Sequence, residues 1–91
     1  MKNWTDAEVK GKILDKLLRR GKVEHSHTAI EFLQKGFPKD MVGRVKEIVQ
    51  ELVKENVLYV KPTSYGLQVS VNIDKSETMR MYVQAFHNAD S

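Results

Sequence analysis

The chain has 91 residues, 41% hydrophobic and 30% charged, which is the composition of one ordinary globular domain. It has no cysteine, so disulfide bonds and thiolate metal sites are excluded. No apolar run approaches the roughly 20 residues of a membrane helix, and the N-terminus lacks the apolar core of a secretory signal. We therefore expect a single cytoplasmic domain over residues 1–91 with no membrane partner.

The net charge of +3 is spread unevenly along the chain. Residues 1–24 hold seven Lys or Arg against four Asp or Glu, whereas residues 38–55 hold four of each kind. Such a weak basic excess suits a nucleic-acid partner without requiring one.

A first helix is predicted over residues 5–20. Thr5 and Glu8 have capping-box spacing, Trp4 can pack onto Val9 as a staple, and Gly21 is a typical terminator. Basic residues cover much of the surface beside the apolar stripe: Lys10, Lys12, Lys16, Arg19 and Arg20. We favour the interpretation that these side chains only solvate the helix. The alternative is that some of them contact a nucleic-acid backbone, namely Arg19, Arg20 and the nearby Lys22.

A short second helix is predicted over residues 28–35. Thr28 and Glu31 repeat the capping-box spacing, and Gly36 ends the helix. The partly alternating residues 23–27 are expected to form a small strand that pairs with a later hairpin.

The third helix is predicted over residues 38–55. Pro38 occupies its first position, where a missing N–H costs nothing, and Asn56 is a left-handed terminator. Its apolar residues cluster on one side at about 100° per residue. They are Met41, Val42, Val45, Ile48, Val49, Leu52 and Val53.

Residues 57–72 alternate as two strands, which predicts a hairpin whose connection runs from Pro62 to Gly66.

A last helix is predicted over residues 75–88, with Asp74 and Glu77 at capping-box spacing. Its apolar stripe either packs on the first helix or, as we favour slightly, forms a homodimer. The stripe is Met79, Tyr82, Val83 and Phe86.

This order of elements predicts an α+β fold, a winged helix-turn-helix with a three-helix core, a short β-hairpin wing and an additional C-terminal helix. Three stretches strengthen the prediction: KGFP (35–38), VQELVKENVL (49–58) and KPTSYGLQVSVN (61–72). Over about residues 22–73, the chain resembles small single-domain winged-helix proteins of archaea that are taken to be DNA-binding regulators. The resemblance implies a winged-helix fold and DNA binding, and it carries over no operator, ligand or catalytic residue.

As a transcription regulator on double-stranded DNA, the protein would place its third helix in the major groove. The candidate contacts there are Lys39, Gly43, Arg44, Lys46 and Gln50. Gly43 either lets the helix backbone approach DNA closely or is a tolerated glycine that costs up to about 1 kcal/mol.

Further candidate contacts to the DNA backbone or minor groove lie in the hairpin: Lys61, Thr63, Ser64 and Tyr65. The alternative is that Thr63 and Ser64 only form the turn and that Tyr65 packs over the hairpin, which we favour for Tyr65.

A protein-interaction module is the competing function. Asp40, Glu47 and Glu51 make the third helix mixed rather than basic, and each would repel phosphate unless paired with a cation. Glu47 and Glu51 can pair with Lys46 or Lys54. A protein partner suits a face of mixed charge, whereas the basic excess and the family resemblance favour DNA.

Neither catalysis nor a cofactor is expected. The sequence contains no nucleophile elbow, no phosphate-binding glycine loop and no H-E-x-x-H motif. His25 and His27 have a spacing that can hold a metal ion in a strand, but no third ligand is evident, so we expect no metal site. His87 is expected to interact with the dipole of the last helix.

Overall fold

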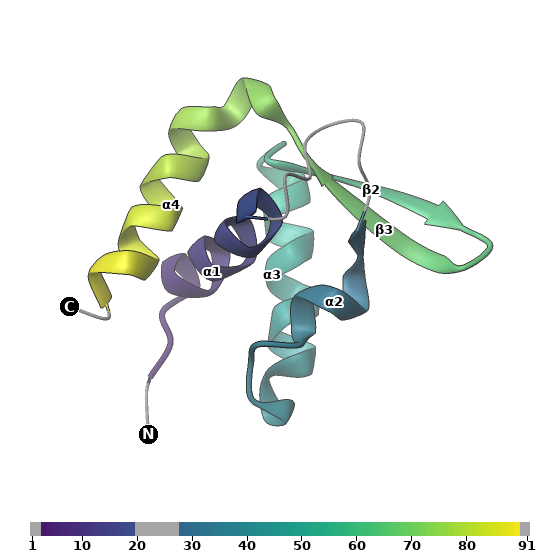
Figure 1. Cartoon of the computed structure of the whole chain (residues 1–91), viewed down its shortest axis with the longest axis horizontal. Coiled ribbons are helices and arrows are strands. Elements are labelled where there is room, and N and C mark those ends of the chain that lie inside the picture. The colour runs from purple at the N-terminus through teal and green to yellow at the C-terminus, as the bar shows by residue number, and fades with distance from the viewer. Residues whose placement is uncertain (1–2, 20–27, 90–91) are drawn as a thin grey trace.

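The computed structural model describes residues 3–19 and 28–89 of the chain. Within them it has four α-helices and three strands (Figure 1). The helices are α1 (Asp6–Arg19), α2 (Ile30–Gln34), α3 (Val42–Lys54) and α4 (Ser76–Ala89), and two short 3-10 helices, η1 (Lys39–Met41) and η2 (Ile73–Lys75), precede α3 and α4. The strands β1 (Thr28–Ala29), β2 (Leu58–Thr63) and β3 (Gly66–Val71) form an antiparallel sheet in the order β1-β3-β2. The fold is therefore α+β and is compatible with a winged-helix-like arrangement.

The hydrophobic core lies between α1, α3 and the inner face of the sheet. The predicted apolar stripes of both helices are buried there, including Ile13 and Leu17 of α1 and Ile48 and Leu52 of α3. In strand β3, Val69 and Val71 are buried as expected, but Ser70 is buried too, whereas Leu67, nearer the hairpin tip, is 43% exposed. The helical and strand periodicities of the sequence thus account for most of the core.

Helix α4 packs along the opposite side of α1 from α3, so α1 lies between the two (Figure 1). Gly11 makes this contact possible. A Cβ atom at position 11 would stand 2.0 Å from the carbonyl oxygen of Tyr82 and 2.7 Å from the Cβ of Phe86. Because backbone atoms of α4 occupy the space of a side chain, only glycine fits at this crossing.

The first helix begins as predicted. The amide of Glu8 donates to Thr5 Oγ1 at 3.2 Å, so Thr5 caps the helix as predicted, and the Thr5 hydroxyl group donates to Glu8 Oε1 at 3.2 Å. The predicted terminator Gly21 lies outside the described residues. At the end of α3, Asn56 has φ +63°, which confirms it as a left-handed terminator.

The capping box predicted for the second helix is wrong. Thr28 lies in β1, paired with Val69, and α2 begins two residues later at Ile30 without a side-chain cap. A Thr before a short helix favours either a cap or a strand, and here pairing with β3 prevails. The strand predicted over residues 23–27 lies outside the described residues.

Two other boundaries differ from the predicted ones. Pro38 precedes η1 as its cap instead of opening an α-helix. At the other end of the domain, the side chain of Asn72 accepts a hydrogen bond from the amide of Asp74 and caps η2, so Asp74 lies within η2 instead of capping α4. Because a 3-10 helix precedes each of these α-helices, α3 begins four residues later than predicted and α4 one residue later.

We predict that Gly11→Ala lowers the free energy of unfolding by roughly 1–3 kcal/mol, because the added methyl group forces α4 away from α1. Gly43→Ala is the matched control, since a Cβ at position 43 meets no atom within 4 Å. In the control, the better helix propensity of alanine should raise stability by about 0.5–1 kcal/mol. Urea unfolding followed by circular dichroism measures both changes, and a stabilised Gly11→Ala protein would contradict the close crossing.

Candidate nucleic-acid interface and the adjoining groove

The outward side of α3 brings together four of the five residues predicted on it. Lys39, Gly43, Lys46 and Gln50 are all exposed, while Val45, Ile48, Val49 and Leu52 on the inward side are buried. Residues three or four apart share one face of a helix, so these side chains form a continuous polar strip that starts in η1.

Arg44 does not belong to this strip. Its guanidinium donates hydrogen bonds to the carbonyl oxygen of Trp4 at 2.6 Å and to Asp6 Oδ1 at 2.8 Å. The indole of Trp4 in turn packs between the rings of Phe37 and Phe86. Arg44 therefore fastens the segment before α1 to α3, and sequence spacing did not reveal this long-range contact.

The acidic residues of α3 are divided between two sides of the helix. Asp40 and Glu47 are exposed beside the polar strip. Glu51 forms an ion pair with Lys10 of α1 at 3.3 Å, instead of the predicted pairing with Lys46 or Lys54. The strip consequently keeps two exposed carboxylates close to its lysines.

The hairpin is longer, and its turn tighter, than the sequence predicted. Pro62 and Thr63 remain in β2, which leaves Ser64 and Tyr65 as the two turn residues. Thr63 Oγ1 donates to the carbonyl oxygen of Gly66 at 2.7 Å and accepts from the amide of Tyr65 at 3.1 Å. The turn-forming role of Thr63 is thereby confirmed, and the hairpin projects away from the helices (Figure 1).

Tyr65 does not pack over the hairpin, so that prediction is wrong. Its side chain is 90% exposed, because both turn residues extend beyond the last cross-strand pair, Thr63 and Gly66. Lys61 is exposed as well and lies on the sheet face opposite Val60. The end of the hairpin thus presents one cation, one aromatic ring and the Ser64 hydroxyl group.

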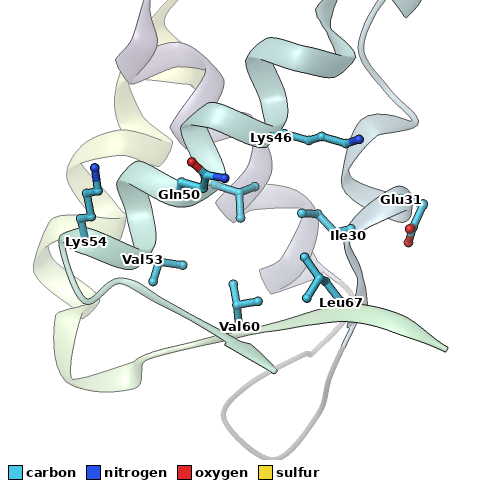
Figure 2. Close-up of a pocket in the computed structure, with 9 residues that line it drawn as sticks. Ile30, Glu31, Lys46, Gln50, Val53, Lys54, Val60 and Leu67 are labelled. Carbon is cyan, nitrogen blue, oxygen red and sulfur yellow. The ribbon is translucent and has the colours of Figure 1, made fainter. Parts of the chain in front are cut away.

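A groove of about 570 Å³ lies between α3, the start of α2 and the hairpin. Figure 2 shows the side chains of Ile30, Val53, Val60 and Leu67 converging on this space. Polar residues stand on its rim, with Lys54 and Glu31 at opposite ends (Figure 2). Among the described residues, the lining is Ile30, Glu31, Lys46, Val49, Gln50, Val53, Lys54, Val60 and Leu67.

The sequence carried a signal for this groove that we did not use. Val53 and Leu67 continue the apolar patterns of α3 and β3 beyond the region that the core covers, so they remain partly exposed. When the hydrophobic periodicity of a helix or strand continues beyond the point where the neighbouring element diverges, its last apolar residues are only partly covered and indicate such a groove.

The basic residues of α1 are mostly engaged within the protein, so simple solvation does not describe them. The ammonium group of Lys12 donates to the carbonyl oxygen of Gly36 at 2.5 Å, and that of Lys16 lies 4.3 Å from the ring centre of Phe32. Arg19 pairs with Asp15, and the same aspartate lies 3.2 Å from Nε2 of His87. The predicted contacts of Arg20 and Lys22 fall outside the described residues.

Lys10, Glu55 and Tyr82 form a network that joins α1, the end of α3 and α4. The ammonium group of Lys10, which is largely buried, donates to Glu55 Oε2 at 2.7 Å, and the hydroxyl group of Tyr82 donates to Glu55 Oε1 at 2.5 Å. None of the three lines the groove between α3 and the hairpin. The network is therefore an internal brace between three helices.

The three groups hold one another in their usual charge states. Burial disfavours the ionised form of Glu55, but the hydrogen bonds from Lys10 and Tyr82 outweigh burial, so the pKa of Glu55 is lowered. Burial likewise opposes the charge of Lys10, yet the hydrogen bond to Glu55 and the nearby acidic groups raise the pKa of Lys10. Burial and the hydrogen bond to Glu55 both raise the pKa of Tyr82.

The stripe predicted to form a homodimer has a partner within the chain. Met79 is 4% exposed in the core, Tyr82 and Val83 pack against it, and Phe86 stacks on Trp4 with ring centres 6.4 Å apart. This is the arrangement expected of the stripe in a monomer. The part of α4 that remains exposed includes Met81, which is 58% accessible.

The described residues contain no group of three or more His, Asp or Glu placed to hold a metal ion. His25 and His27 lie outside them. Within the same segments, no helix combines the length and apolar composition needed to cross a membrane.

Comparisons with protein-family models, with curated proteins and with solved structures found no match to this chain.

We predict that Glu55→Gln lowers stability near neutral pH and weakens its dependence on acid. A carboxyl group whose pKa is lowered on folding stabilises the protein above its usual pKa of about 4.5, and this contribution disappears as the pH falls through the lower folded-state value. Because Glu55 is only partly buried, we expect a loss of about 1–2 kcal/mol at pH 7.

Urea unfolding at a series of pH values from 7 down to 3 measures this effect. Glu47→Gln removes an exposed carboxylate from the same helix and controls for the loss of one charge. The difference in unfolding free energy between wild type and Glu55→Gln should begin to shrink below about pH 4.5 and disappear once the pH is below the lowered folded-state pKa of Glu55. A constant difference across the whole range would contradict the role assigned to the Glu55 carboxylate.

Proposed function

We propose that the chain is a cytoplasmic winged-helix protein that binds duplex DNA, with α3 in the major groove and the β2–β3 hairpin against the backbone. The observation that carries the proposal is the exposed strip of Lys39, Gly43, Lys46 and Gln50 on α3, next to a projecting hairpin with Lys61 and Tyr65 near its tip. Local transcription regulation is the role that such binding would serve.

Three observations support DNA as the partner. The element order from α1 to β3 places a helix and a hairpin side by side, as winged DNA-binding domains do. Among the described residues, no ion pair joins Lys39, Lys46 or Lys61 to a carboxylate, so their charges are available to phosphates. Gln50 can also read base edges with its amide.

A protein partner is the second candidate, and specific residues favour it. Asp40 and Glu47 stand exposed beside the lysines of the strip, and Leu67 and Tyr65 are 43% and 90% exposed on the hairpin. Exposed aromatic and apolar side chains next to charges of both signs are typical of protein interfaces. A homodimer remains a further proposal, for which the exposed part of α4 offers a surface.

We predict that the protein binds a labelled mixed-sequence duplex, measured by fluorescence anisotropy, and that binding weakens steeply as salt is raised. Lys46→Ala should reduce the slope of log affinity against log salt by about 1, because one phosphate contact is lost. The matched control is Arg80→Ala, which removes one charge from α4 on the far side of α1. Absence of binding at low salt would refute DNA as the partner and favour the protein candidate.

We predict that Gly43→Ala has opposite effects on folding and on DNA binding. Nothing in the free protein obstructs a Cβ at position 43, so the stability of the fold should rise. If the backbone of α3 approaches DNA at this glycine, the methyl group should weaken duplex binding about tenfold in the same anisotropy assay. Unchanged affinity would assign Gly43 to the tolerated helix glycines and place the closest DNA contact elsewhere on α3.

A further inference from the structure

The groove between α3 and the hairpin has the chemistry of a small-molecule site. Five of its nine lining residues are aliphatic, and they come from α2, α3, β2 and β3. The volume of about 570 Å³ falls within the range of roughly 300–1,000 Å³ that is typical of ligand pockets. Nine residues are few for a stable protein interface, which uses about 20–30 on each side.

The charged residues on the rim of the groove indicate which charge its ligand should carry. Lys46, Gln50 and Lys54 recur at every fourth position, so they follow one edge of the groove along about 12 Å of α3. Within the described residues, neither ammonium group forms an ion pair. Glu31, the acidic residue among the described residues of the lining, stands at the end opposite Lys54 (Figure 2).

We propose that this groove binds a small carboxylate with an apolar body. The apolar body would lie on Val53, Val60 and Leu67, where it removes partly exposed aliphatic surface from water. The carboxylate would lie at the Lys54 end, because Lys54 offers a charge-assisted hydrogen bond there, whereas at the other end Glu31 offsets the charge of Lys46, which extends toward it (Figure 2).

Such a ligand would also control the proposed DNA interface, an extension that rests on the proposed function. Lys46 and Gln50 belong both to the strip and to the groove. A carboxylate at the Lys54 end lies about one helical turn, roughly 6 Å, from Gln50 of the strip, so it places negative charge near the path of a DNA phosphate, and the two ligands should compete.

Octanoate is the probe for the site, used below its micelle-forming concentration and at constant ionic strength. Amide chemical shifts of the ¹⁵N-labelled protein should change at Val53, Val60 and Leu67, and saturate. Octan-1-ol and octylammonium have the same chain without the negative charge, so both should bind more weakly. Equal binding of all three would overturn the carboxylate selectivity, and an absence of saturable shifts would overturn the site.

Two variants test the assigned roles of the residues. Lys54→Gln should weaken octanoate about fivefold, the size expected for one charge-assisted hydrogen bond at a partly exposed site. Leu67→Gln should weaken octanoate by a similar factor through loss of apolar contact. Arg80→Gln changes the net charge equally and should leave the affinity unchanged, because α4 contributes none of the described residues that line the groove. A Lys54→Gln affinity equal to that of wild type would overturn the proposed orientation of the ligand.

The competition is measured separately, by repeating the DNA anisotropy titration with saturating octanoate. An apparent DNA affinity that falls with octanoate in wild type, but less so in Lys54→Gln, supports control of the interface. Octanoate binding without any DNA binding refutes the proposed function and leaves the ligand site standing. Simultaneous binding of both, with no change in affinity, overturns the control but neither binding site.

Discussion

The close crossing of α1 and α4 at Gly11 is the constraint on which the arrangement of the helices depends. It brings Tyr82 near enough to reach Glu55 at the end of α3, and Lys10, one residue before the glycine, completes the brace. One face of α3 is consequently fixed by the core and by ionic contacts to α1. The opposite face of α3 is exposed and does not pack in the core, so the residues of the polar strip are available for binding.

The same constraint determines how α4 is used. Helix α4 could expose its apolar stripe only if it stood away from α1, but without a side chain at position 11 the two backbones approach and the stripe is covered. Trp4 extends this contact, since its ring lies between Phe37 and Phe86 and its carbonyl oxygen is held by Arg44. The N-terminal segment, α4 and the start of α3 are thereby joined, although they are distant in sequence.

Features that depend on neighbouring residues could be predicted from the sequence, whereas contacts between residues distant in the chain could not. Hydrophobic periodicity and local terminators are encoded within a few residues, so the helices, the hairpin and the cap at Thr5 were predicted with boundaries that differ by at most four positions. Lys10 and Arg44 were placed on the surface because their partners, Glu55 and Asp6, are about 40 residues away in the chain. Gly11 carried a local signal, since a glycine inside a strong helix pattern often marks close packing.

The binding surfaces depend on how far the hairpin extends. Pro62 lacks an N–H group, yet it remains in β2 because this strand lies at the edge of the sheet that the described residues form, where one side of the backbone pairs with no described strand. Strand β2 therefore continues to Thr63. Leu67 of β3, which pairs with Pro62, consequently lies beyond the core and lines the groove beside α3. A shorter hairpin would have neither a groove beside α3 nor an exposed ring at its tip. The length of β2 thus places a polar strip and an apolar groove next to each other, with Lys46 and Gln50 common to both.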